Sequence, residues 1–220
     1  AEAELRAYIE PSLGKDAESV ALRKISINPG HRQEFWHRNC VAIGMSAGFL
    51  EPLEASALVL VELSAEMLSE QLPVTRDTMD IVARRFNEKF RYRWDRVIDF
   101  LKLHYVLSER RDTDFWVENR DEQSIPDSLE ELLTLWRRHY PVNADFSQIG
   151  EVFSAASYQY VLYGMGFETV PGPATSRPLP DSEAERMFAE NAENTRKMLA
   201  GLPSNRKLIN TIKESGLRAA

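Results

Sequence analysis

Cysteine, basic clusters and long apolar runs are nearly or wholly lacking in this sequence. Cys40 is the single cysteine among 220 residues, which excludes an internal disulfide and favours a reducing compartment such as the cytoplasm. No stretch approaches the roughly 20 apolar residues of a membrane span, so we expect no membrane association. A formal net charge of −7 without a Lys/Arg cluster argues against nucleic-acid binding. No histidine pair has metal-ligand spacing on one helix face, so we expect no metal site.

Apolar residues are plentiful, at 43% of the chain, and most follow a helical period. The clearest stripe runs Met79, Val82, Phe86, Phe90, Trp94, Val97, Leu101 and Tyr105. The predicted helices cover 2–10, 54–71, 75 to about 110, 126–140, part of 146–166, 181–201 and 205–216, and 112–120 is expected to be a connector. Probable strands at 31–36 and 38–44 precede the main helices. The predicted fold class is therefore mainly α with a short β segment at its start.

Three regions follow from these patterns. Residues 1–53 hold the short strands and a glycine-containing loop, and 54–170 hold the main helices. Residues 171–220 combine a proline-rich stretch with two polar helices. Because the chain opens inside a predicted helix without an initiator methionine, we expect it to be part of a longer polypeptide.

Residues 39–54 are the most informative segment. An apolar run, in which Cys40 is expected to be a buried small hydrophobe, leads into a loop with two glycines, a proline and two carboxylates. The next seven residues carry no charge and predict the start of a buried helix, whose free N–H groups favour an anion. Glu51 fits a first-turn or capping acid, whereas Glu54, next to this uncharged run, is expected to face an interior or a cleft.

The same segment, Asn-Cys-Val-Ala-Ile-Gly-Met-Ser-Ala-Gly-Phe-Leu-Glu-Pro-Leu-Glu, closely resembles a block of the flavin-dependent tryptophan halogenases. Further motifs resemble the same family over roughly residues 1–170. They are Phe86-Asn87, Trp94-Asp95-Arg96, Asp99 to Tyr105, Arg111 to Trp116, and Ala155 to Tyr158 with Gly164-Met165-Gly166.

The resemblance implies a flavin-binding module that carries a helical substrate module, of which this chain would be the C-terminal portion. Family members use reduced FAD (FADH2) and oxygen to oxidise chloride or bromide, and hypohalous acid then reaches an aromatic substrate beside a lysine and a glutamate. Glu54 matches the catalytic glutamate, and the backbone N–H groups of Ser56 and Ala57 match the halide site. Flavin contacts would involve Gly44, Met45, Gly48 and Leu58, and substrate contacts would involve Phe153 and Tyr158.

The implied partners are an aromatic small molecule, a flavin reductase and, as a guess for the last helices, a second copy of the chain in a homodimer. The nucleotide-binding glycines, a Trp-x-Trp-x-Ile-Pro segment and the catalytic lysine would lie before Ala1, so this chain alone is expected to be inactive. Val142, Gln148 and Val152 stand where tryptophan-specific members carry binding side chains, so another indole, a phenol or a larger aromatic is also open. The alternatives are a flavin-dependent hydroxylase and a non-catalytic helical module.

Overall fold

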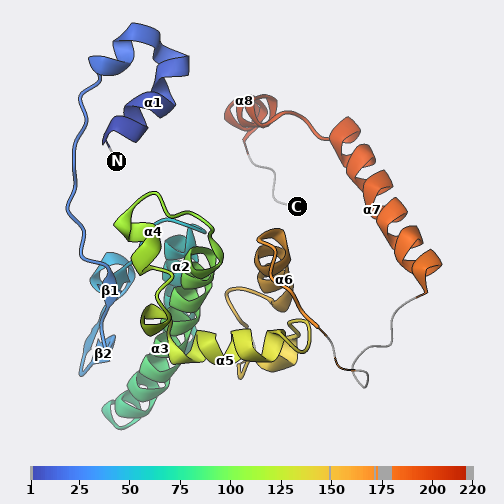
Figure 1. The fold of residues 1–220 in the computed structure, drawn as a ribbon. Coiled ribbons are helices and arrows are strands. Elements are labelled where there is room, and N and C mark those ends of the chain that lie inside the picture. The colour runs from blue at the N-terminus through green and yellow to red at the C-terminus, as the bar shows by residue number, and fades with distance from the viewer. Residues whose placement is uncertain (1, 149, 171, 173–179, 217–220) are drawn as a thin grey trace. The chain divides into compact units, whose positions relative to one another are not determined.

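The computed structural model describes residues 2–148, 150–170, 172 and 180–216 (Figure 1). Tertiary contacts divide the chain into two units, Ala1–Val170 and Pro171–Ala220. The helices of the first unit are α1 (Glu2–Leu13), α2 (Ser56–Gln71), α3 (Arg76–Leu107), α4 (Asp114–Glu118), α5 (Asp127–Trp136) and α6 (Ala155–Gly164). Short 3-10 turns are η1 (Gly14–Glu18), η2 (Gly44–Ser46), η3 (Glu122–Ser124) and η4 (Asn143–Asp145). The mainly α fold class is confirmed.

The β segment is smaller than the sequence predicted. It consists of four two-residue strands, β1 (Gly30–His31), β2 (Trp36–His37), β3 (Cys40–Val41) and β4 (Gly48–Phe49), paired antiparallel as β1 with β4 and β2 with β3. Side chains alternate along a strand, and in β3 Val41 packs against the apolar core that contains Phe35 and Trp36, while Cys40 is exposed. The expectation that Cys40 is buried is therefore wrong.

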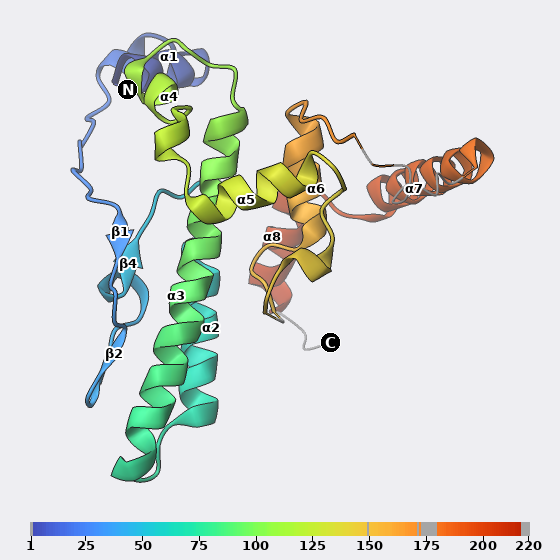
Figure 2. The same ribbon diagram turned by 60° about the horizontal axis from the view of Figure 1, so that its bottom comes forward.

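Helix α3 is the central helix of the first unit, and α2 lies beside it (Figure 2). The predicted apolar stripe of α3 supplies Phe86, Phe90, Trp94, Val97 and Leu101 to one core, which also includes Phe35 and Trp36. Phe86 and Phe90 stack with their ring centroids 4.4 Å apart. The helical period thus places these side chains on one face, as the sequence predicted.

Helix α2 is less buried than its apolar sequence predicted. Its buried face is Ser56, Leu60, Ser64 and Met67, at helical spacing, whereas Leu58 is 78% exposed. The sequence shows that α2 is apolar, but only the packing shows which of its faces this chain covers.

A second core joins the C-terminal half of α3 to α5 and α6. It is formed by Phe100, Leu103, Leu129, Leu132, Trp136, Tyr158 and Leu162.

Two predictions of local structure in the first unit are corrected. Residues 114–118 form the short helix α4 rather than a plain connector, and α1 continues past Pro11 to Leu13. Pro11 lies near the end of α1, where its missing N–H removes a single bond from the last turn.

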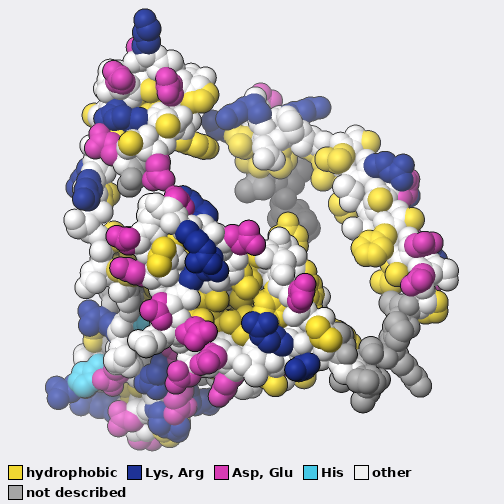
Figure 3. Space-filling model, viewed as in Figure 1, with side chains coloured by type: hydrophobic (Ala, Val, Ile, Leu, Met, Phe, Trp, Pro, Cys, Tyr) yellow, Lys and Arg dark blue, Asp and Glu magenta, His cyan; other side chains and the backbone are white. Residues whose placement is uncertain are grey.

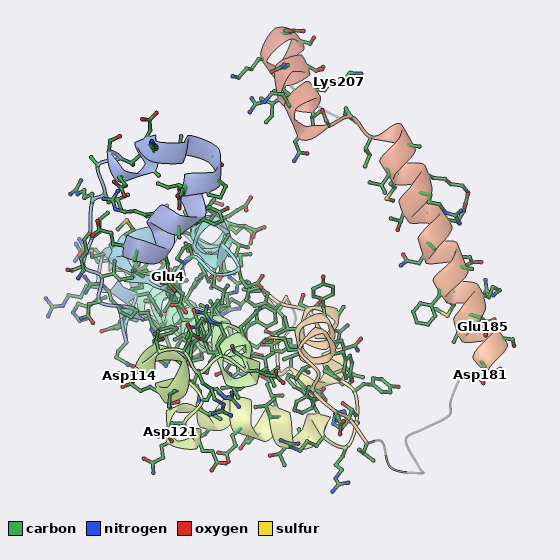
Figure 4. All side chains as sticks on the ribbon, turned by 45° about the horizontal axis from the view of Figure 1, so that its top comes forward. Glu4, Asp114, Asp121, Asp181, Glu185 and Lys207 are labelled. Carbon is green, nitrogen blue, oxygen red and sulfur yellow. The ribbon has the colours of Figure 1, made fainter. Side chains whose placement is uncertain are left out.

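The second unit contains α7 (Asp181–Gly201) and α8 (Asn205–Ser215), as predicted. Asp181, labelled in Figure 4, and Glu183 lie in the first turn of α7, where the positive end of the helix dipole stabilises acidic side chains. Neither helix has a buried residue. Most of the predicted proline-rich linker lies outside the described residues, and the three-part division at residues 53 and 170 stays a prediction.

Candidate active site

The turn from β4 into α2 has an unusual backbone. Glu54 and Ala55 have φ angles of +66° and +49°, in the left-handed region that residues with a β-carbon seldom adopt. The Ala55 N–H donates to the Pro52 carbonyl at 3.0 Å, which closes the turn. Helix α2 then begins without a side-chain cap and without an acidic residue in its first turn. Its first N–H groups, on Ser56 and Ala57, are therefore available to an anion.

An apolar cavity of about 290 Å³ lies beside this helix start. Its walls come from the loop around η2, from α2 and from the aromatic face of α3. Six residues predicted to bind flavin or halide are among those that line it: Gly44, Met45, Gly48, Ser56, Ala57 and Leu58. We call this space the loop cavity. Met45 and Leu58 are 83% and 78% exposed, so this chain leaves part of the apolar wall uncovered.

The two glycines of the loop are required for different local reasons. Gly44 has a φ of +63°, which glycine adopts without strain. A β-carbon on Gly48 would lie 2.7 Å from the Gly30 carbonyl oxygen and 2.7 Å from the His31 Cβ. Gly48 is therefore needed for the pairing of β4 with β1, whatever the loop cavity binds.

Glu54 faces a different space and has a defined partner. Its Oε1 lies 2.9 Å from His104 Nε2, and the two side chains are 36% and 18% exposed. Both line an open groove along α6, which we call the α6 groove. An adjoining pocket, which shares Glu54, Ala156 and Tyr160 with the first, is lined by Phe100 and Phe153, and we include both pockets in the α6 groove.

Glu51, the second carboxylate of the turn, is also held by α3. The Tyr105 hydroxyl donates to Glu51 Oε1 at 2.9 Å. Burial, with a further contribution from Glu51, raises the pKa of Tyr105 to about 12. Because Glu51 lines the loop cavity and Glu54 lines the α6 groove, residues 51–58 run between the two spaces.

The two predicted substrate residues lie in different environments. Phe153 stacks on Phe100, with 3.8 Å between ring centroids, and faces the α6 groove near Glu54. Tyr158 is 1% exposed and packs between Phe100 and Trp136. The structure thus places Tyr158 in the second core, while Tyr160, at 84% exposure, stands in the groove. Hydrophobic side chains gather on the face where α5 and α6 lie (Figure 3).

His104 and Tyr105 are the site residues that sequence reasoning did not assign. Tyr105 belongs to the predicted apolar stripe of α3, and His104 directly precedes it. This adjacency is the one signal in the sequence that links His104 to a pocket. The pairing with Glu51 and Glu54 spans about fifty residues of sequence and depends on the tertiary fold.

Among the described residues, no group of three His, Cys, Asp or Glu is arranged to hold a metal ion. No helix in the described ranges is long and apolar enough to cross a membrane.

With this geometry in place, comparison with known proteins identifies the family. The model of the tryptophan halogenase family matches residues 1–181. The chain belongs to the tryptophan halogenase family. The match includes the turn with Glu54, the α2 start, and helices α3 to α6.

Solved structures and curated sequences agree with this membership. A tryptophan halogenase from Shewanella frigidimarina NCIMB 400 has a TM-score of 0.88 and 43% identity, covering 98% of this chain and 41% of that one. BrvH, a flavin-dependent halogenase from Brevundimonas sp. BAL3, has a TM-score of 0.68 and 33% identity, covering 84% of this chain and 36% of its own. The tryptophan 6-halogenase SttH from Streptomyces toxytricini is 30% identical over 93% of this chain and 38% of SttH. The chain thus spans about 38 to 39% of the length of the curated relatives it matches.

Proposed function

We propose that this chain contributes one wall of the flavin site, the halide site and the catalytic glutamate of a flavin-dependent halogenase. Its substrate would be an electron-rich aromatic of the tryptophan, indole or phenol type, and its halide chloride or bromide. The observation that carries the proposal is the position of residues 51–58 between the loop cavity and the α6 groove. One short segment thereby serves an oxidising site and a substrate site at once.

Glu54 is the residue that acts on the substrate in this proposal. Halogenation of an aromatic ring forms a carbon–halogen bond and releases the ring proton. A carboxylate beside the ring can orient the halogenating species and accept that proton. Glu54 suits both roles because it lines the α6 groove beside the aromatic rings of Phe100 and Phe153.

In this proposal the halide would bind at the start of α2. The backbone N–H groups of Ser56 and Ala57 are uncapped, and both residues line the loop cavity. The helix has sixteen residues, so its dipole adds a positive partial charge at this end. An anion is favoured here over any cation, and an apolar wall suits a weakly hydrated ion such as chloride or bromide.

The loop cavity fits one face of a flavin ring. Its lining is mainly apolar, and Gly44 and Gly48 contribute only backbone atoms to it. The exposed side chains of Met45 and Leu58 offer apolar contact to a planar ring that rests on them. When bound, reduced FAD with oxygen supplies the oxidation of the halide, and a flavin reductase would supply the reduced flavin. A reducing compartment, as the single cysteine favours, suits this chemistry.

A fusion protein tests the proposal. The part of the Shewanella frigidimarina halogenase that this chain does not match is joined to the 220 residues, in the order of that relative. The fusion receives reduced FAD, oxygen, bromide or chloride, and a panel of tryptophan, indole and phenol. We expect a halogenated product by mass spectrometry, and we expect Glu54→Gln to reduce the rate by about a hundredfold or more.

Two controls accompany the fusion. The 220 residues alone should give no halogenated product, because they cover about 39% of the length of such enzymes. A fusion that binds FAD but forms the same hydroxylated product with or without halide would contradict the proposal in favour of a hydroxylase. A fusion whose rate is unchanged by Glu54→Gln would remove Glu54 from the reaction.

A further inference from the structure

The strained turn at Glu54 has two anchors, and both come from adjacent residues of α3. Neither Glu54 nor Ala55 is a glycine, yet both have positive φ angles. A conformation of this kind persists only where the surroundings hold it. His104 holds Glu54 and Tyr105 holds Glu51, so two neighbouring side chains fix the turn at both of its carboxylates.

The orientation of the His104 ring is itself fixed. Its Nδ1 lies 2.8 Å from the Phe100 carbonyl oxygen, one helical turn earlier. The ring also packs edge-on against Phe100, with 5.1 Å between centroids. A carbonyl oxygen can only accept, so Nδ1 must carry hydrogen in this contact. Nε2 is therefore the nitrogen that faces Glu54.

His104 Nε2 lies 2.9 Å from Glu54 Oε1, within ion-pair distance, and the pair is charged when both ring nitrogens of His104 carry hydrogen. This ion-pair contact engages one of the two carboxylate oxygens. In the part of the chain that the structure describes, Glu54 makes no other hydrogen bond or ion pair, and its side chain lines the α6 groove. The second oxygen thus remains available to the contents of the groove.

From this geometry we propose that His104 is the positioning residue of Glu54. It holds one carboxylate oxygen through Nε2 and so aims the other into the α6 groove. Tyr105 has a separate task, since it ties Glu51 on the loop-cavity side of the same turn. The catalytic role of this arrangement rests on the function proposed above, whereas the His104–Glu54 contact itself does not.

The first test uses the 220-residue chain and needs no activity. Long-range proton–nitrogen NMR of histidine-labelled protein reports both ring nitrogens of each imidazole, and His104→Phe identifies the resonances of His104 among the four histidines. We expect Nδ1 of His104 to carry hydrogen. Glu54→Gln should move the Nε2 resonance and leave Nδ1 in place, while the matched control Tyr105→Phe should move neither.

Glu54→Asp, one methylene shorter, replaces Glu54→Gln if that variant does not fold by circular dichroism. An Nε2 resonance that does not respond to either change overturns the inference. An Nδ1 without hydrogen overturns it as well, because the ring would then present a different nitrogen to Glu54.

The second test measures turnover in the fusion described above. His104→Phe keeps an aromatic ring but no N–H, and we expect kcat to fall about tenfold or more while KM for the aromatic substrate stays within about twofold. His104→Gln keeps a donor and should recover most of that loss. His37→Phe makes the same substitution at an exposed histidine that pairs with Glu34 outside both spaces, and it should change kcat by less than about threefold.

The two tests separate the two proposals. An inactive parent fusion with the expected NMR response contradicts the proposed function and leaves the His104–Glu54 contact supported. An active fusion in which His104→Phe keeps its full kcat overturns the positioning role, even if the NMR response is present.

Discussion

At the scale of single residues, Asn87 provides the hydrogen bonds that a neighbouring strand would otherwise supply. Its Oδ1 accepts from the backbone N–H groups of Phe35 and Trp36, each at 2.8 Å, and its Nδ2 donates to the Trp36 carbonyl at 2.8 Å. Asn87 is 8% exposed and lies on α3. One amide thus attaches the edge of β2 to the helix that carries His104.

Asn87→Ala leaves three backbone groups of residues 35–36 without their partners. Since an unsatisfied buried polar group costs about 1–3 kcal/mol, we expect the free energy of unfolding to fall by about 3 kcal/mol. Urea denaturation followed by circular dichroism measures it. Glu88→Ala is the matched control, because Glu88 is exposed and pairs with Arg84 at 3.4 Å, and it should cost less than about 0.5 kcal/mol. Equal losses in the two variants would contradict this account of Asn87.

A second residue-scale prediction concerns the halide. Ala57→Pro removes one N–H from the first turn of α2, where proline is tolerated better than in a helix interior. A hydrogen bond to a charged group is worth about 1.5–3 kcal/mol. In the fusion, the bromide concentration for half-maximal rate should therefore rise by about tenfold or more. Ala57→Gly keeps the N–H and should leave it within about threefold, and an unchanged value in Ala57→Pro would exclude that amide from the halide site.

At the scale of elements, a buried carboxyl joins α3 to α5. Asp99 is 1% exposed, pairs with Arg96 at 2.7 Å and accepts from the Ser128 hydroxyl at 2.8 Å. Burial raises the pKa of Asp99 from 3.8 to about 6, although Arg96 and Ser128 act in the opposite direction. The folded chain therefore holds a proton on Asp99 at a pH where the unfolded chain has released it.

This proton makes stability depend on pH in a defined direction. The contribution of Asp99 is fully present below pH 3.8 and is lost as the pH rises through about 6. Relative to Asp99→Asn, which has no proton to release, the wild-type chain should lose about 2 kcal/mol of unfolding free energy between pH 4 and pH 7. Urea denaturation of both proteins across this range measures the difference. A difference that is flat with pH, or that changes in the opposite direction, would contradict a raised pKa.

The elements differ in how far sequence could predict them. Helix α3 could be predicted because its large apolar residues recur every three or four positions and no proline interrupts them. The short β segment could be predicted as well, but the bounds of its strands could not, because two-residue pairings leave little alternation to detect. Within the site, Glu54 and the α2 start follow from a local sequence, whereas the burial of Tyr158 and the exposure of Tyr160 depend on which face of α6 meets Trp136. The contact of His104 with Glu54 depends on the packing of α3 against a turn that is distant in sequence.

At the scale of the whole molecule, residues 1–170 carry all of the buried apolar side chains that the structure describes. Both cores are formed within this unit, and no residue of α7 or α8 is buried. The family model ends at residue 181, at the first residue of α7. The last two helices therefore add little to the core that the rest of the chain depends on.

Removal of the second unit tests this division. A chain that ends at Val170 keeps both cores and both anchors of the turn, so we expect cooperative unfolding with a melting temperature within about 3 °C of the 220-residue chain. Its histidine NMR spectrum should retain the His104 signature, because His104, Phe100 and Glu54 all lie in the remaining unit. Loss of cooperativity or of that signature on truncation would show that α7 and α8 stabilise the site. Retention of both would place any role of these helices outside the folding of residues 1–170, for example in the contact between two copies that the sequence left open.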